Sequence, residues 1–256
     1  MRLATFNILH GRSVTDGEVR LDRFAAAVSA LDADVLALQE VDRDQPRSHG
    51  ADLTSLAAEA MGAPEHRFVA TLHGEPGLWT AATGDHQPAR ASYGIALLSR
   101  HPVLEWRVLQ LPTLRRRTPV RWPGTRWPTL VRDEPRAALA AVVQGPEGVL
   151  SVVATHLTFI PGWTGRQLRH LATQVHPLTR PLVLMGDLNL DGPGSTRWSG
   201  MRPLATADTF PVASPARQLD HVLGDGPVRA AGPARAVDTG LSDHRALVVD
   251  VTLAAG

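Results

Sequence analysis

The stretch LVLMGDLNL at residues 182–190 decides how the rest of the chain is arranged. An apolar run that ends in Gly, Asp and Asn predicts a buried strand with polar side chains at its C-terminal end. Asp187 and Asn189 are two residues apart, so in extended structure they face the same way. The Asp offers an anionic oxygen that can bind a cation or take a proton from water, and the Asn offers a donor and an acceptor. Taken alone, the same letters are also typical of a turn.

Composition sets the limits for the remainder of the chain. The 256 residues are 43% hydrophobic and 20% charged, which is ordinary for a globular protein, and we expect one domain over residues 1–256. The formal net charge is +1, every basic residue is Arg, and there is no Cys, which excludes disulfide and thiolate chemistry. We find neither a signal peptide in MRLATFNIL nor an apolar run of membrane-spanning length, so we expect a cytoplasmic protein.

Apolar runs along the chain predict a sheet protein with few helices. Strands are expected at residues 2–9, 35–41, 67–72, 93–99, 103–111, 136–143, 149–158, 182–190, 218–223 and 246–253. Helices are expected at 53–61, at 166–175 and after Asp22, which we take as the N-cap of a helix bearing Phe24, Val28 and Leu31 on one face. This inventory indicates two mixed sheets packed face to face and covered by helices. Residues 74–90, 112–133 and 191–215 are interpreted as loops.

Polar residues stand at the ends of separate apolar runs, and strands of this kind would bring them to one rim. These residues are Asn7, Glu40, His156, Asp187, Asn189, Asp220, Asp243 and His244. Their oxygen atoms suit a hard divalent cation such as Mg²⁺, and the absence of Cys argues against a structural zinc site. The imidazoles suit acid–base chemistry near neutral pH.

Seven ordered blocks carry a resemblance to a known family: TFNILHG, LQEVD, YGIALLSR, THL, GDLN, QLDHVL and SDHRALVVD. Together they resemble the endonuclease/exonuclease/phosphatase superfamily, and the His in THL resembles its deoxyribonuclease, sphingomyelinase and deadenylase branches. The resemblance implies a four-layer α/β (α+β) sandwich, with two central mixed sheets flanked by helices. It also implies a Mg²⁺-dependent phosphoester hydrolase, with Mn²⁺ as a possible substitute.

The resemblance also implies a role for each matched residue. Glu40 is the expected main Mg²⁺ ligand, with Asn7 beside it on metal or phosphate, and Asp243 binds a second cation or braces its loop. Asp187 is expected to orient or deprotonate the attacking water, and Asn189 to hold a phosphate oxygen. Asp220 is expected to fix the tautomer of His244 and favour its charged form. His156 is expected to stabilise the transition state or to protonate the leaving oxygen.

One position departs from the family's pattern. Apurinic endonucleases commonly carry Asp or Asn two residues after the Asn of the first strand, whereas this chain has Leu9. An abasic-site repair role is therefore disfavoured.

Three further residues are candidate substrate contacts, each with an open alternative. Arg136 either reaches a phosphate or lies along the protein surface. Tyr93 either contacts substrate or belongs to the core. Trp163, at the end of FIPGW, either forms a substrate wall or packs as a plug. The Arg-rich residues 114–136, with Trp122 and Trp127, suit nucleic acid, an anionic lipid surface, or a solvated loop whose tryptophans cover the core edge.

The expected substrate is a phosphodiester: a small molecule, a lipid head group or a nucleic acid. Because the net charge is near zero, we favour a smaller or lipid-like phosphodiester over a nucleic acid duplex. The alternatives are a nuclease and a non-catalytic binding module of the same fold. No protein partner is implied.

Overall fold

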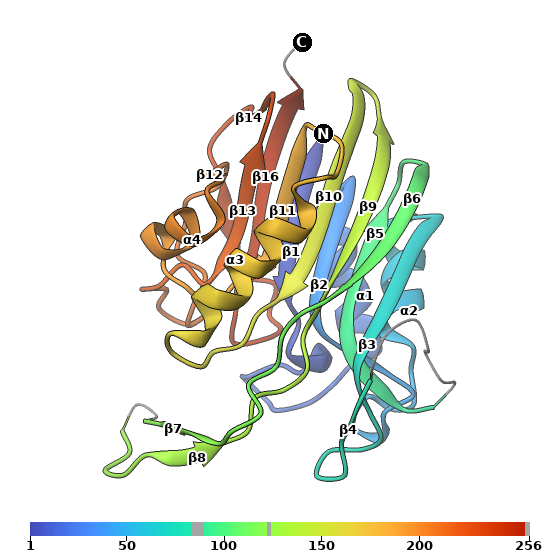
Figure 1. The fold of residues 1–256 in the computed structure, drawn as a ribbon. Helices are drawn as coiled ribbons and strands as arrows, with labels where there is room; N and C mark the ends of the chain where they lie inside the picture. Colours follow the sequence, from blue (N-terminus) through green and yellow to red (C-terminus); the bar gives the residue numbers. More distant parts are fainter. Residues whose placement is uncertain (83–89, 122–123, 254–256) are drawn as a thin grey trace.

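The structure is a computed structural model that describes residues 1–82, 90–121 and 124–253. Trp122 and residues 83–89 of the expected loop at 74–90 lie outside the described residues. Two large sheets face each other in the centre of the molecule (Figure 1). The fold therefore confirms two packed mixed sheets.

The first sheet has eight strands in the order β14-β16-β1-β2-β5-β3-β4, with β15 paired to β16. Only β1 and β2 among these neighbours run parallel. Its strands are β1 (Arg2–Asn7), β2 (Val35–Arg43), β3 (Glu65–His73), β4 (Thr80–Ala81), β5 (Ser92–Ser99), β14 (Val228–Ala230), β15 (Arg235–Val237) and β16 (Ala246–Leu253).

The second sheet has six strands in the order β12-β13-β11-β10-β9-β6, in which β10 and β11 are the parallel pair. A hairpin turn at residues 145–148 joins β9 to β10. The strands are β6 (Val103–Gln110), β9 (Ala137–Gly145), β10 (Gly148–His156), β11 (Leu182–Asp187), β12 (Arg202–Pro203) and β13 (Asp220–Asp225).

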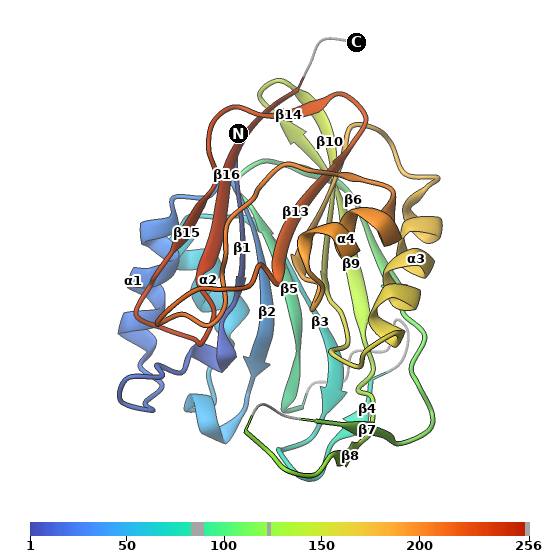
Figure 2. The same ribbon diagram turned by 90° about the vertical axis from the view of Figure 1, so that its left-hand side faces the viewer.

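Helices cover the outer face of each sheet and complete four layers (Figure 2). The first sheet carries α1 (Leu21–Leu31) and α2 (Leu53–Met61), and the second carries α3 (Trp163–Val175) and α4 (Gly192–Ser199). Short 3₁₀ turns η1 (Leu9–Gly11) and η2 (Pro46–Ser48) follow β1 and β2. None of the described helices is long and apolar enough to cross a membrane.

The central strands are continuous apolar runs because both of their faces are buried. In β11, Val183 and Met185 enter the core between the sheets, whereas Leu182 and Leu184 pack under α3. This alternation follows from the two-residue period of a strand. Close approach of backbones also selects glycine: a Cβ on Gly186, whose φ is 151°, would lie 1.9 Å from the carbonyl oxygen of Thr155.

Several local expectations were wrong, among them the loops at 74–90 and 112–133, which contain β4 and the strands β7 (Thr118–Val120) and β8 (Thr129–Val131). Asp22 is not the N-cap of α1, because the helix starts at Leu21 and Asp22 pairs with Arg20 instead. Residues 191–215 are not all loop, because α4 forms in their Gly- and Pro-rich start, where Asp191 accepts a hydrogen bond from the backbone N–H of Gly194. Likewise, β11 ends at Asp187, three residues before the expected end.

The Arg-rich stretch forms a two-stranded hairpin of β7 (Thr118–Val120) and β8 (Thr129–Val131), which projects from the body (Figure 1). Trp127 is 73% exposed, so it does not cover the core edge. The guanidinium of Arg126 lies 5.6 Å from the centre of its ring.

Candidate active site

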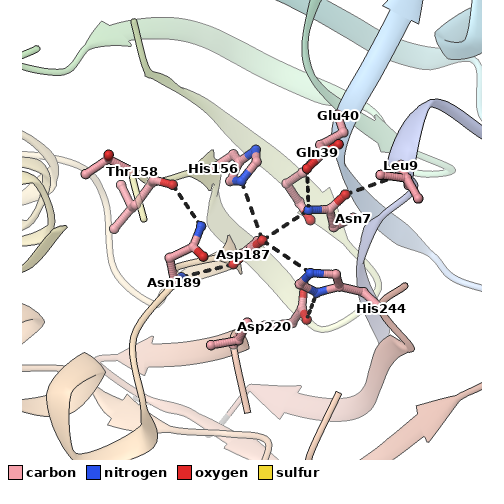
Figure 3. A network of polar contacts seen from close by, with 12 residues as sticks. Asn7, Leu9, Gln39, Glu40, His156, Thr158, Asp187, Asn189, Asp220 and His244 are labelled. Carbon is pink, nitrogen blue, oxygen red and sulfur yellow. Dashed lines mark hydrogen bonds and ion pairs between the residues drawn. The ribbon is translucent and has the colours of Figure 1, made fainter. Parts of the chain in front are cut away.

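Strand ends bring the expected polar residues to one rim (Figure 3). His156 ends β10, Asp187 ends β11, and the pairing of the two strands sets these residues side by side. Asp220 begins the antiparallel neighbour β13 and is the register partner of Asp187. Asn7 ends β1 in the other sheet, and its Nδ2 donates to Asp187 Oδ2 over 3.1 Å. The site therefore joins the two sheets.

Asp187 lies at the centre of this group. Its side chain is 2% exposed, and Oδ1 accepts the backbone N–H of Asn189 over 3.0 Å. Oδ2 lies 3.5 Å from His156 Nε2 and 3.8 Å from His244 Nε2. Burial, reinforced by the charge of Asp220, raises the pKa of Asp187 to about 7. A carboxyl with this pKa can accept a proton from water near neutral pH.

Asp220 and His244 form a buried pair. His244 Nδ1 lies 2.8 Å from Asp220 Oδ2, which also accepts the hydroxyl of Thr209 over 2.6 Å. Burial opposes the charged imidazole, but the Asp220 charge and hydrogen bond, helped by Asp187, outweigh it and raise the pKa of His244 to about 10. His244 is therefore a cation whose Nε2–H points toward Asp187 (Figure 3).

His156, unlike His244, is neutral. Arg136 Nη1 donates to His156 Nδ1 over 3.0 Å, and since a guanidinium can only donate, the ring proton resides on Nε2. Burial and the Arg136 charge lower the pKa of His156 well below its ordinary value. His156 is thus a neutral donor beside Asp187. Arg136 itself is fixed between this ring and Glu134, at 3.0 Å.

Glu40 reaches the site through an irregularity in β2. Gln39 pairs with Ile95 and Val41 with Gly94, so Glu40 is an extra residue, and its φ of 58° is left-handed. Its Oε1 accepts Asn7 Nδ2 over 3.1 Å. Burial raises the pKa of Glu40, and the nearby Asp243 charge adds to this effect. The bulge therefore holds a buried carboxylate beside Asn7, and the hydrogen bond from Asn7 and the charge of Arg136 offset part of the effect of burial.

These residues fit a divalent cation. No ion pair among the described residues includes Glu40 or Asp243, so neither carboxylate is in direct contact with a cationic side chain, although the charges of Arg136 and His244 act on Glu40 from farther away. Oxygen donors of this kind suit Mg²⁺ or Mn²⁺. Asn7 bridges Glu40 and Asp187 with its amide nitrogen, while its Oδ1 accepts the backbone N–H of Leu9 over 3.2 Å.

Asp187, Asp220 and His244 also bring ligand atoms within 4.8 Å of one another. This second cluster is a poorer metal site, because the ring of His244 is protonated and donates to Asp220.

Asn189, Tyr93 and Trp163 lie in different surroundings. Asn189 has a φ of 50° and donates Nδ2 to the carbonyl of Leu157 over 3.0 Å, so it turns away from the extended path expected for it. Burial, followed by the charge of Glu40, raises the pKa of the Tyr93 hydroxyl. Trp163, by contrast, lines a separate cavity of about 220 Å³ with Leu114 and Arg116.

The sequence did not single out several supporting residues. Ser242, at φ 62°, donates Oγ to the carbonyl of Asn7 over 2.6 Å and accepts the backbone N–H of His244 over 3.1 Å. Phe210 packs its ring 5.0 Å from that of His244. Ser242 belongs to the SDH block, so that motif held a usable signal, whereas Thr209 and Phe210 lie in an irregular stretch that showed none.

Solved structures provide an independent comparison. An endonuclease/exonuclease/phosphatase from Beutenbergia cavernae DSM 12333 is 26% identical with a TM-score of 0.73, over 99% of this chain and 71% of that chain. A mannosyl-6-phosphatase of Bacteroides thetaiotaomicron VPI-5482 is 14% identical with a TM-score of 0.63, over 99% and 100% of the two chains. Sphingomyelinase C from Streptomyces griseocarneus is 16% identical with a TM-score of 0.59, over 97% and 98%. The last two likenesses show the fold alone.

A comparison with curated proteins finds no match. The model of the Endonuclease/Exonuclease/phosphatase family, however, matches residues 4–244 and so spans every residue of the rim described above. The chain belongs to the Endonuclease/Exonuclease/phosphatase family.

Proposed function

We propose that this chain, a member of a family that hydrolyses phosphoester bonds, is a Mg²⁺-dependent phosphodiesterase in which Mn²⁺ can substitute. The observation that carries the proposal is the surroundings of Asp187 Oδ2. A buried carboxylate oxygen meets an amide, a neutral imidazole and a charged imidazole at 3.1, 3.5 and 3.8 Å. Such a group is equipped to hold a nucleophilic water next to donors for a phosphate.

Asp187 is the proposed base. It accepts one proton of the attacking water, whose oxygen forms the new bond to phosphorus as the bond to the leaving oxygen breaks on the opposite side. Its Oδ1 is fixed by the backbone of Asn189, so Oδ2 keeps one orientation. Its pKa of about 7 matches a base that works near neutral pH.

The two histidines and Asn189 are the proposed phosphate donors. His244 offers a charged Nε2–H and His156 a neutral one. Both Nε2 atoms face Oδ2 of Asp187. Asn189 uses its amide on Leu157 and has a second N–H for a phosphate oxygen. Fixed donors of this kind stabilise the charge that grows on the phosphoryl oxygens.

Glu40, Asn7 and Asp243 are the residues that would hold the cation. When bound there, the cation supplies Lewis-acid stabilisation of a phosphoryl oxygen. Glu40 and Asn7 are in direct contact at 3.1 Å, and Asn7 connects this side of the site to Asp187.

Hydrolysis by the purified protein tests the proposal. Bis-(p-nitrophenyl) phosphate, p-nitrophenyl phosphate, DNA, RNA and sphingomyelin would each be offered with Mg²⁺, with Mn²⁺ and with chelator. We expect metal-dependent cleavage of a diester that falls by at least about 100-fold in Asp187→Asn. Asp32→Asn, on an exposed carboxylate at the end of α1, is the matched control and should behave as the wild type.

The same assay separates the alternatives. A nuclease would bind its substrate with a steep dependence on salt concentration, and a small-ester hydrolase would not. Binding without metal-dependent turnover, unchanged in Asp187→Asn, would contradict the proposal in favour of a binding module.

A further inference from the structure

A second cavity lies beside the catalytic rim, where the loops after β1 and β2 meet. Its volume is about 730 Å³, which is the size of a small-molecule site. We call it the basic pocket, after the ionisable residues that line it: His10, Arg12, Glu18, Arg20, Arg47 and His49.

Hydrogen bonds join the basic pocket to the catalytic rim. The carbonyl of Arg12 accepts the backbone N–H of Ser242 over 2.8 Å, and Ser242 Oγ in turn donates to the carbonyl of Asn7. On the other side of the pocket, Arg47 lies close enough to Glu40 for that carboxylate to raise the pKa of the guanidinium. A ligand in the pocket would thus be next to the proposed cation site.

Two of the three arginines that line the pocket are held by carboxylates. Arg47 donates Nε and Nη2 to Asp42 over 2.8 and 2.7 Å, and Arg20 pairs with Asp22 at 3.0 Å. Arg12 differs, because within the described part of the chain no carboxylate lies at ion-pair distance from it. Its Nε donates to the carbonyl of Gly17 over 3.2 Å, which fixes the side chain and leaves its two terminal nitrogens for a ligand.

The backbone under the pocket is strained. Leu9, His10 and Gly11 have φ values of 44°, 48° and 80°, a left-handed run that is unfavourable for the first two residues. Strain of this kind persists where the surroundings impose it and is concentrated at ligand sites. Here it holds His10 in the wall of the pocket, which Arg47 also lines.

We propose that the basic pocket binds a second phosphate group of the substrate, separate from the phosphoester that is hydrolysed. The inference rests on the proposed function and narrows it to phosphoesters that carry a further phosphate. Arg20 and Arg47 are paired with Asp22 and Asp42, so the uncommitted positive charge of the wall is that of Arg12, which supplies donors with the fork geometry that phosphate requires.

A titration with inorganic phosphate tests the pocket without relying on turnover. The ring C–H signals of His10 and His49 would be followed by NMR in the presence of chelator, while those of His156 and His244 report on the catalytic rim. We expect saturable shifts of the His10 and His49 signals, with an affinity that falls about tenfold in Arg12→Gln. Arg107→Gln, an exposed arginine of β6 paired with Glu105, is the control and should bind as the wild type. Signals of His10 and His49 that do not move, or that move equally in Arg12→Gln, would overturn the proposal.

A matched pair of substrates then tests specificity. Thymidine 5′-(p-nitrophenyl phosphate) and its 3′-phosphorylated form differ by one phosphate only. We expect the wild type to favour the phosphorylated form in kcat/KM, and Arg12→Gln to lower that preference about tenfold. Equal kcat/KM for the pair in the wild type would contradict the inference. Absence of hydrolysis of both would count against the proposed function instead, and the phosphate titration would still decide the pocket.

Competition identifies the source of the second phosphate. Inhibition by oligothymidylate that weakens in Arg12→Gln would point to a nucleic acid, and the same behaviour with fructose 1,6-bisphosphate would point to a phosphorylated small molecule. Both results support the pocket, whereas inhibition that is indifferent to Arg12→Gln opposes it.

Discussion

The charge of His244 depends chiefly on Asp220. Asp220 raises the pKa of this imidazole to about 10 although burial acts in the other direction. In Asp220→Asn the opposing effect of burial should dominate, so we expect the pKa of His244 to fall below that of the wild type, together with a loss of hydrolysis of at least about 100-fold. An NMR titration of the His244 ring measures this change. An unaltered pKa would show that Asp220 does not control the charge.

The tautomer of His156 is set from twenty residues away, by Arg136. Arg136→Met keeps most of the side-chain volume and removes the donor, so both neutral tautomers should become populated and hydrolysis should fall about tenfold. The ¹⁵N shifts of the His156 ring report the tautomer. Arg136→Lys, which restores a donor, should recover part of the loss. A ring that stays fully Nε2-protonated in Arg136→Met would refute this role.

At the scale of single residues, the sequence and its family resemblance predicted which side chains meet and the charged form of His244, but not the neutral tautomer of His156. Motif order and strand ends were sufficient to gather Asp187, Asp220 and His244 at one rim. Arg136 was assigned either to a phosphate or to the surface, because nothing in PRAALAA indicates that its guanidinium turns toward a histidine of the next strand.

At the scale of elements, the buried strands were predictable, since runs such as VLALQEV have no alternative to a two-sided core. The bulge that turns Glu40 toward the catalytic rim was not predictable, because a Glu with a left-handed φ leaves no signal in the composition of the strand. Helix α4 was missed for a related reason: its residues GPGSTRWS have low helix propensity, and a cap by Asp191 starts the helix.

The bulge of β2 predicts that replacing Glu40 raises the free energy of unfolding and abolishes hydrolysis. Asn tolerates the left-handed φ of 58° better than Glu does, and Glu40→Asn also removes a buried carboxylate near Asp243. With chelator present, we expect the free energy of unfolding in urea to rise by about 1 kcal/mol while metal-dependent hydrolysis is lost. Glu105→Asn, on an exposed face of β6, should change neither quantity. A less stable Glu40→Asn protein would argue against strain at the bulge.

Asp52, which caps the N-terminus of α2, and Asp22, which was expected to cap α1 but does not, make a matched test of the fold. Asp52 Oδ1 accepts the backbone N–H groups of Thr54 and Ser55 over 2.9 and 3.1 Å, whereas Asp22 caps no helix. Asp52→Ala should lower the free energy of unfolding by about 1 kcal/mol, and Asp22→Ala by less than about 0.5 kcal/mol. Urea denaturation measures both. Equal losses would mean that the side chain of Asp22 does contribute to the start of α1.

At the scale of the whole molecule, pairing of the apolar runs into two covered sheets was predictable, and the family resemblance gave the four layers. The basic pocket was not predictable from the sequence. Its walls come from loops around His10, Arg20 and Arg47, and how closely these loops approach one another depends on where β1 and β2 end. Arg12 and His49 showed no pattern in the sequence that would separate them from solvated surface residues.

The pH dependence of folding tests the packing around His10. Burial, together with the charge of Arg47, lowers the pKa of His10 to about 4 from 6.5. Because the unfolded chain then binds more protons between these two values, His10 contributes stability that is fully present above pH 6.5 and is lost as the pH falls toward 4. A shift of this size corresponds to roughly 3 kcal/mol, which partial exposure of the ring should reduce to about 1–2 kcal/mol.

His10→Gln should therefore flatten the dependence of the free energy of unfolding on pH within that window, and leave it unchanged above pH 6.5. Urea denaturation at a series of pH values, in buffers free of phosphate, measures the difference between the two proteins. Phosphate has to be absent because a ligand of the folded basic pocket would stabilise the wild type by mass action. Parallel curves for wild type and His10→Gln would mean that the ring is hydrated in the folded protein and that the left-handed turn does not bury it.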